Sequence, residues 1–168
     1  MSNRSKKELI EEITDRLRVM QVTTDLFDDA AAARLGVNRT DLRLLDVLER
    51  LGPLTPSRLA ELNDLSRPAM TTAIDRLERA GYARRVPDLT DRRRLLVEID
   101  PRARRRAMEI YGPFADCSQT EFARYTGQEL DVIDRFLAHA IELTRAQLAR
   151  IRPGPRPDGA GTGMEQAP

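Results

Sequence analysis

The chain of 168 residues is long enough to bury one core and too short for two large domains. Its hydrophobic share of 40% and charged share of 33% are typical of a folded protein, and its longest apolar run, residues 30–33, cannot cross a bilayer. The chain has one cysteine and one histidine, which excludes an intramolecular disulfide and a Cys/His zinc site within one chain. Its aromatic share of 4% argues against stacking on single-stranded nucleic acid as the main activity. The N-terminus has no apolar signal segment, so we expect a cytoplasmic protein.

The formal net charge of +1 is unevenly distributed along the sequence. Residues 55–106 carry a net charge of +5, whereas residues 1–54 carry −1 and residues 107–168 carry −3. A basic central module between acidic flanks favours binding to a polyanion. The alternative is a surface that is simply rich in arginine, because nearly all basic residues of the chain are arginine.

Apolar residues at helical spacing predict two helices in the N-terminal third. The first covers about residues 6–35 and ends at Gly36, a residue type that favours a helix C-terminus. The second begins at Thr40 and stops at the Gly-Pro pair 52–53. Its inward-facing residues are expected to be Leu42, Leu45, Leu48 and Leu51.

A short helix and a longer one are predicted next. Thr55 supplies a capping hydroxyl and Pro56 suits the first helical position, so a helix is expected from there to about Leu62. Ser66 caps the following helix, which ends at Gly81. The buried stripe of that helix is expected to be Met70, Ile74 and Leu77.

The periodicity then changes from helical to alternating. Residues 95–99 alternate in polarity as a strand with one buried face does, and residues 83–86 form a plausible antiparallel partner. Residues 87–94 would then be a hairpin loop with a basic tip.

Two more helices are predicted, at about residues 101–125 and 128–151, and the second carries an apolar stripe like that of the first helix. The tail at residues 153–168 is rich in proline and glycine and is expected to be disordered. The predicted fold class is therefore mainly α with a small β-hairpin.

A short helix, a tight turn, a second helix and a hairpin follow one another in the order of a winged helix-turn-helix. The second helix fits the DNA major groove, and the hairpin reaches the neighbouring minor groove. The outward-facing positions of that helix are predicted to be Arg67, Ala69, Thr71, Thr72, Asp75 and Arg76.

These stretches resemble the MarR family of transcriptional regulators. The matching residues are 54–61, 66–72, 75–82 and the wing segment 88–93, which contains Asp91-Arg92-Arg93. The resemblance implies a homodimer whose terminal helices intertwine and whose two wings flank a pseudo-palindromic operator. It also implies a small-molecule effector that binds beside the aromatic residues of the flanking helices.

The predicted organisation has four parts. Residues 1–37 form an N-terminal dimerisation helix, residues 38–100 the winged helix-turn-helix, residues 101–152 the C-terminal dimerisation helices, and residues 153–168 the tail. The apolar stripes of the first and last helices are each long enough to need a partner surface. The alternative to dimerisation is that they pack on each other within one chain.

Each candidate residue is assigned a role. Arginine and short polar side chains of the second helix would face base edges or phosphates, a serine and the cap of the third helix would hold a phosphate, and wing arginines would enter the minor groove. The DNA-binding candidates are Ser57, Ser66, Arg67, Ala69, Thr71, Thr72, Arg76, Arg92, Arg93 and Arg94. Asp91 is expected to orient a wing arginine. The candidate effector pocket is Phe27, Tyr111 and Phe114, and the alternative is that these aromatic residues belong to the hydrophobic core.

These features predict a sequence-specific regulator of transcription that binds double-stranded DNA as a homodimer and responds to a small molecule or other signal. Repression is the expected mode of action, and activation is the alternative, because the sequence does not give the sign of regulation. The alternatives are a non-specific architectural DNA-binding protein and a winged-helix module for protein–protein contact. No nucleophile and base arrangement and no phosphate-binding loop indicate an enzyme, and no cofactor or metal is expected. Cys117 is expected to be buried, and His139 to have a structural role.

Overall fold

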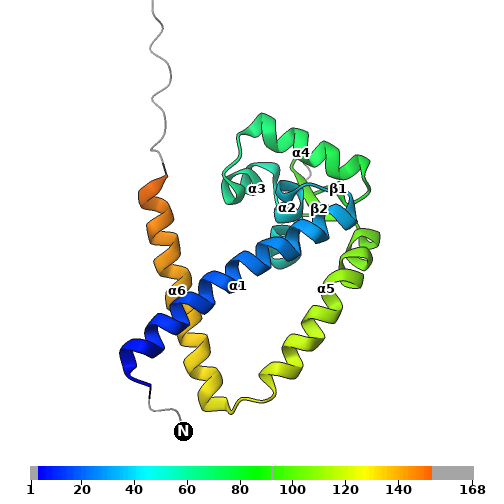
Figure 1. The fold of residues 1–168 in the computed structure, drawn as a ribbon. Coiled ribbons are helices and arrows are strands. Elements are labelled where there is room, and N and C mark those ends of the chain that lie inside the picture. The colour runs from blue at the N-terminus through cyan, green and yellow to red at the C-terminus, as the bar shows by residue number, and fades with distance from the viewer. Residues whose placement is uncertain (1–3, 92, 153–168) are drawn as a thin grey trace, which may run out of the picture. The chain divides into compact units, whose positions relative to one another are not determined.

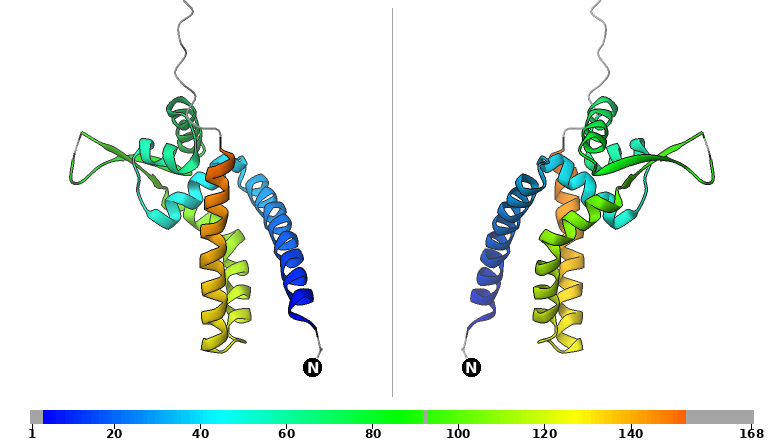
Figure 2. Two further views of the ribbon diagram at one scale, coloured as in Figure 1. Left: turned by 90° about the vertical axis from the view of Figure 1, so that its left-hand side faces the viewer. Right: turned by 90° about the vertical axis from the view of Figure 1, so that its right-hand side faces the viewer.

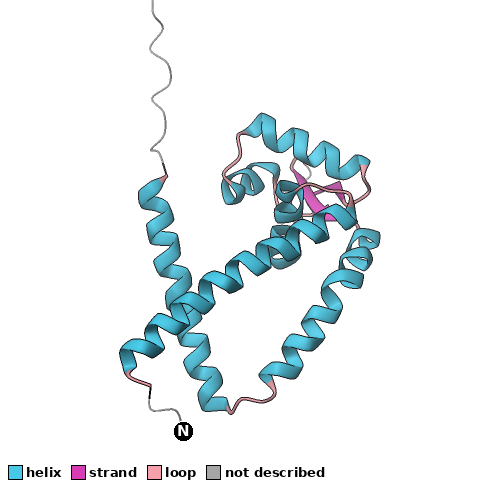
Figure 3. Cartoon of the chain, in the orientation of Figure 1, coloured by secondary structure: helices cyan, strands magenta, loops and turns pink. Residues whose placement is uncertain are grey.

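The computed structural model describes residues 4–91 and 93–152. These form six helices and one two-stranded antiparallel sheet (Figures 1 and 3). Arg92 and the tail expected to be disordered lie outside the described residues. The elements are α1 (Lys6–Leu35), α2 (Arg39–Leu51), α3 (Pro56–Asn63), α4 (Arg67–Arg79), β1 (Ala83–Pro87), β2 (Leu95–Ile99), α5 (Pro101–Phe122) and α6 (Gly127–Ile151).

The chain divides into two compact units, residues 1–115 and 116–168. The first contains the core, and the second contains the end of α5 and all of α6. No residue between 116 and 152 is buried, which includes Cys117, so its predicted burial is wrong. Among the described residues, no helix has the length and apolar character needed to span a membrane.

Local capping explains most helix boundaries. Gly36 ends α1 in the left-handed conformation at φ 69°, and the hydroxyls of Thr55 and Ser66 accept backbone N–H groups at the starts of α3 and α4. α2 begins one residue earlier than predicted because Asn38 is its N-cap and accepts the Asp41 N–H at 2.8 Å. The turn between α3 and α4 is tight because Asp64 adopts a left-handed conformation, at φ 55°.

The core of the first unit lies between α2, α3, α4 and the hairpin. Leu44, Leu59 and Val97 are fully buried there, and β2 is held to the chain before α3 by two hydrogen bonds between Val97 and Leu54, at 2.7 and 3.0 Å. In α2 the predicted inward face was too narrow, because Leu44 is buried whereas Leu51 is 55% exposed. The core therefore covers a wider arc of α2 than the predicted leucines, which are spaced three residues apart.

The hairpin projects from this core (Figure 2). Its strands pair in one register from Ala83 opposite Ile99 to Pro87 opposite Leu95, so the connecting loop is residues 88–94, as the sequence pattern predicts to within one residue. The root of the hairpin is fixed by Tyr82, which is buried and donates a hydrogen bond from its hydroxyl to the Leu35 carbonyl at 2.6 Å.

Candidate nucleic-acid interface

The N-terminal half of α4 presents a polar surface. Arg67, Ala69, Thr71 and Thr72 are exposed. On the opposite face Met70, Ala73, Ile74 and Leu77 are buried. The helical period of the apolar residues therefore places the candidate contact residues outside the core, as their spacing predicts.

The two threonines of α4 have defined hydroxyl orientations. Thr71 donates its hydroxyl proton to the Arg67 carbonyl and Thr72 donates to the Pro68 carbonyl, both at 3.1 Å. Each side chain is thus left with a methyl group and hydroxyl lone pairs for an outside partner.

The start of α4 and the start of α3 share a surface hollow. Ser57 and Ser66 both line it, together with Arg67. The hollow is not basic overall, because Asp64 and Glu61 also line it, and Glu61 pairs with Arg58 at 2.9 Å. The serine hydroxyls and one guanidinium are the groups available there to an anion.

The described residues of the hairpin loop are linked by hydrogen bonds. Asp88 accepts the backbone N–H and the hydroxyl of Thr90, and these hydrogen bonds, the backbone one first, lower the pKa of Asp88. Asp91 accepts the Arg93 N–H at 3.1 Å and lies 3.4 Å from Nε of Arg94. The Arg93 side chain is exposed and forms no ion pair with any residue that the structure describes.

Arg76 lies in a different environment from the one its sequence position suggested. Its Nε and Nη2 groups donate to the carboxylate of Asp41 in α2, at 2.7 and 2.5 Å. Asp41 is 1% exposed, and its hydrogen bonds raise the pKa of Arg76. The guanidinium is therefore paired with α2, while 40% of the Arg76 side chain stays exposed to solvent. Asp41 is not among the residues predicted from the sequence, although it lies one turn before Leu44 and Leu45 on the inward arc of α2.

A second arginine connects α4 to the hairpin. Arg85 of β1 donates to Asp75 at 2.6 Å and also to Glu78, whose carboxylate accepts the Arg85 backbone N–H at 2.8 Å. Both acidic residues of the C-terminal half of α4 are thus paired with one guanidinium from the wing.

Comparison with known proteins identifies the family. A model of the MarR family matches residues 35–94. The chain is 32% identical over 153 residues to YcgE of Bacillus subtilis, an uncharacterised HTH-type transcriptional regulator. The aligned region covers 90% of this chain and 99% of YcgE. The chain belongs to the MarR family. It is accordingly a DNA-binding transcriptional regulator and not an enzyme.

Solved structures of MarR-type proteins have the same fold. A MarR family protein from Bacillus stearothermophilus is 18% identical, with a TM-score of 0.62, 84% of this chain covered and 99% of that chain. A transcriptional regulator from Thermotoga maritima, Tm0710, is also 18% identical, with a TM-score of 0.55 and coverages of 83% and 98%. An S. aureus MepR mutant bound to an oligodeoxyribonucleotide is 16% identical, with a TM-score of 0.53 and coverages of 79% and 97%.

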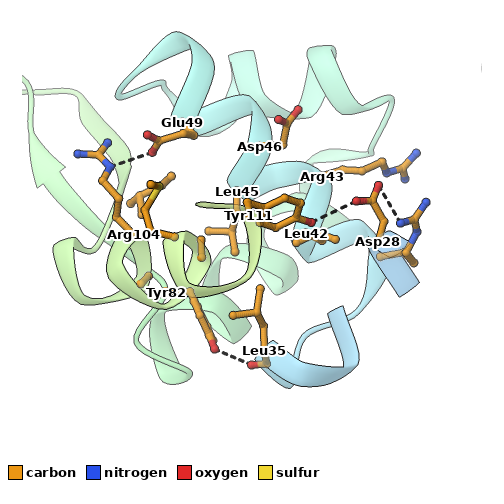
Figure 4. A pocket seen from close by; sticks show the side chains of 15 residues that line it. Asp28, Leu35, Leu42, Arg43, Leu45, Asp46, Glu49, Tyr82, Arg104 and Tyr111 are labelled. Atoms are coloured by element: carbon orange, nitrogen blue, oxygen red, sulfur yellow. Dashed lines mark hydrogen bonds and ion pairs between the residues drawn. The ribbon is translucent and has the colours of Figure 1, made fainter. Parts of the chain in front are cut away.

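This MarR-family chain also contains a cavity of about 300 Å³ in its first unit (Figure 4). Residues of α1, α2 and the first half of α5 line it, among them Leu42, Leu45 and Tyr111. Burial raises the pKa of Tyr111, whose hydroxyl donates to Asp28 at 3.1 Å. Of the three aromatic residues predicted for an effector pocket, Tyr111 is therefore in the lining.

Phe27 and Phe114 do not line this cavity. Their rings pack against each other at 5.5 Å between centroids, and Phe27 meets the Tyr111 ring edge-to-face at 5.4 Å. Phe27 thus contacts the lining residue Tyr111, and Phe114 contacts Phe27. Charged groups at its rim are mostly paired, for example Glu49 with Arg104 at 2.9 Å. The rim residue Arg43 forms no ion pair with a described residue.

Proposed function

We propose that this protein is a sequence-specific operator-binding regulator that acts as a homodimer and represses transcription. The observation that carries the proposal is the exposed polar half of α4 beside a projecting hairpin whose Arg93 has no ion-pair partner among the described residues. A helix of this kind fits the major groove, and a basic hairpin tip fits the adjacent minor groove. The DNA-bound MepR structure, which shares the fold, supports this use of the lobe.

Residues of α4 would read the bases. The hydroxyl oxygens of Thr71 and Thr72 would accept from exocyclic amino groups, because their protons are donated to the helix backbone, and their methyl groups would contact thymine methyls. Arg67 would contact guanine or a phosphate, and Ala69 would allow the backbone to approach closely. Ser57 and Ser66, which share one hollow, would hold a phosphate.

The wing would grip the minor groove. Arg93 would enter it as a free cation, and Arg94 would follow with its position restrained by Asp91. Arg92 is proposed for the same groove from the sequence alone, because it lies outside the described residues.

Dimerisation is supported by the apolar residues of α1 and α6. Large hydrophobic side chains on these helices are exposed, which is costly for a lone chain in water. On α1 they include Leu9, Ile13 and Met20. On α6 they include Leu137, Ile141 and Leu148. We assign residues 1–37 and 101–152 to the dimer interface, residues 38–100 to DNA binding in the cytoplasm, and no role to 153–168.

A small-molecule effector is proposed for the cavity beside Tyr111. The cavity has the apolar lining and the size of a small-ligand site, and α2 connects it to the DNA-binding helices. A ligand that favours a different spacing of the two α4 helices would lower operator affinity. Arg43 at the rim, which forms no ion pair with a described residue, favours a ligand with a negative charge.

Selection of bound duplexes from a random pool by the purified protein tests the proposed function. The proposal predicts a two-fold symmetric consensus whose half-sites are about 34–36 Å apart, one helical turn. Binding without an enriched sequence would instead identify an architectural protein, and absence of duplex binding would identify a protein–protein interaction module.

A further inference from the structure

We propose that Arg76 and Arg85 are positioning residues which fix α4 and the wing as one rigid DNA-reading body and do not themselves contact DNA. Together with Asp41, Asp75 and Glu78 they form what we call the ion-pair frame. This inference rests on the proposed function, and it removes Arg76 from the expected DNA contacts.

The first part of the frame joins α4 to α2. The guanidinium of Arg76 uses two N–H groups for the carboxylate of Asp41, and this planar, bidentate geometry fixes direction as well as distance. Asp41 is 1% exposed, so water cannot replace the arginine. If Arg76 turned toward a phosphate, it would leave a buried carboxylate unpaired, and that cost exceeds what one exposed phosphate contact returns.

The second part of the frame joins α4 to the wing. Arg85 is the middle residue of β1, opposite Val97, and its side chain reaches both Asp75 and Glu78. The Glu78 carboxylate also accepts the Arg85 backbone N–H at 2.8 Å. Three hydrogen bonds from one residue therefore hold the strand against the C-terminal half of α4.

The frame also reduces the negative charge that α4 presents to DNA. Asp75 and Glu78 lie on the helix that would enter the groove, where free carboxylates would repel phosphates. Arg85 pairs with both and offsets one of their two negative charges. The arginines near the interface thus fall into two groups: Arg76 and Arg85 pair with protein carboxylates, whereas Arg67 and Arg93 have no such partner among the described residues.

The frame explains how the two DNA-binding elements keep a common geometry. Base readout requires the side chains of α4 to meet base edges at hydrogen-bonding distance while the wing is in the next groove. With α4 fixed to α2 on one side and to β1 on the other, neither element can rotate alone. Loss of the frame should therefore reduce discrimination between sequences more than it reduces binding to DNA in general.

A double-mutant cycle on Asp41 and Arg76 tests the inference. The variants are Arg76→Gln, Asp41→Asn and the double variant, in which the amide pair can form a neutral hydrogen bond. Affinities are measured over a salt series for the selected operator and for a scrambled duplex of the same composition. The proposal predicts that Arg76→Gln lowers operator affinity at least about tenfold, leaves scrambled-duplex affinity and the salt slope unchanged, and that the double variant regains most of the loss.

Three results would overturn the inference. A salt slope smaller by about 0.9 for each protomer in Arg76→Gln, with no recovery in the double variant, would make Arg76 a phosphate contact. If the affinities for both duplexes fall equally, and in proportion to the fraction of the variant that is folded, the pair has only a structural role. Unchanged operator affinity would show that the pair does not position α4. Arg67→Gln is the matched control, for which a smaller slope and no rescue by Asp41→Asn are expected.

Arg76→Lys keeps the test decisive if Arg76→Gln does not fold. Lysine retains the charge but not the two-point geometry, so the proposal expects operator discrimination to fall at least about tenfold at a constant slope. Retained discrimination would contradict it. A wild-type protein that selects no operator would refute the proposed function instead, and in that case the salt slopes on any bound duplex still decide whether Arg76 contacts phosphate.

Discussion

The variant Arg93→Ala tests how the wing binds DNA. The Arg93 side chain is exposed and has no carboxylate partner among the described residues, so its charge is available to phosphates. One phosphate contact contributes about 0.9 to the slope of log affinity against log salt, which makes about 1.8 for a dimer. At about 0.15 M salt the same relation gives roughly fivefold weaker binding for each protomer and roughly thirtyfold for the dimer.

The assay is fluorescence anisotropy with a labelled operator duplex over a series of salt concentrations. Arg50→Ala is the matched control, because Arg50 is an exposed arginine of α2 that pairs with Asp46 and belongs to neither DNA-binding element. It removes the same charge from the protein and should leave the slope unchanged. Equal slopes for Arg93→Ala and the wild type, or equal losses for Arg93→Ala and Arg50→Ala, would refute the assignment of Arg93 to the DNA interface.

Three further outcomes are expected. Tyr82→Phe should lower the free energy of unfolding by about 1–3 kcal/mol in urea denaturation, because it leaves the buried Leu35 carbonyl without its 2.6 Å partner; an unchanged free energy would contradict this. Carboxyl NMR should give Asp88 a pKa below the ordinary aspartate value, so that its support of the wing turn is present above the ordinary pKa and lost as the pH falls through the lowered one; an ordinary value would remove that support. Ile141→Glu should convert a dimer to a monomer in sedimentation velocity, whereas unfolding at unchanged mass would favour packing of the stripes within one chain.

The fold could be predicted where it depends on local chemistry. Capping by Ser66, the proline that follows it and the left-handed Gly36 are short-range features, and they set helix boundaries almost where the sequence places them. The alternation of residues 95–99 likewise predicts the strand, because a one-residue shift would move Val97 out of the core.

The parts that could not be predicted depend on contacts between distant residues. Asp41 and Arg76 are 35 positions apart, and nothing in either helix alone indicates that one carboxylate will be buried beneath the other helix. The same holds for Arg85, which from the sequence is one more basic residue of a charged strand. Charge patterns locate a basic face, but only the packed structure separates the arginines that are already paired from those that are free.

The effector pocket shows the same limit. Aromatic residues of the flanking helices indicate a cluster, and the cluster exists around Phe27. Which of its rings borders a cavity depends on the depth at which α5 packs on α1 and α2, and only Tyr111 does so. Similarly, Cys117 occupies a helix position that suits a small apolar residue, yet it is exposed in the single chain.

Site-directed DNA cleavage tests the central claim most directly. With Cys117 replaced by serine, a cleavage reagent is attached through Thr72→Cys, and operator binding by the labelled protein is first verified. If α4 enters the major groove of each half-site, strand scission should be confined to two clusters about one helical turn apart. Scission spread evenly along the duplex, or a pattern equal to that of the same reagent attached through Arg50→Cys, would contradict the account.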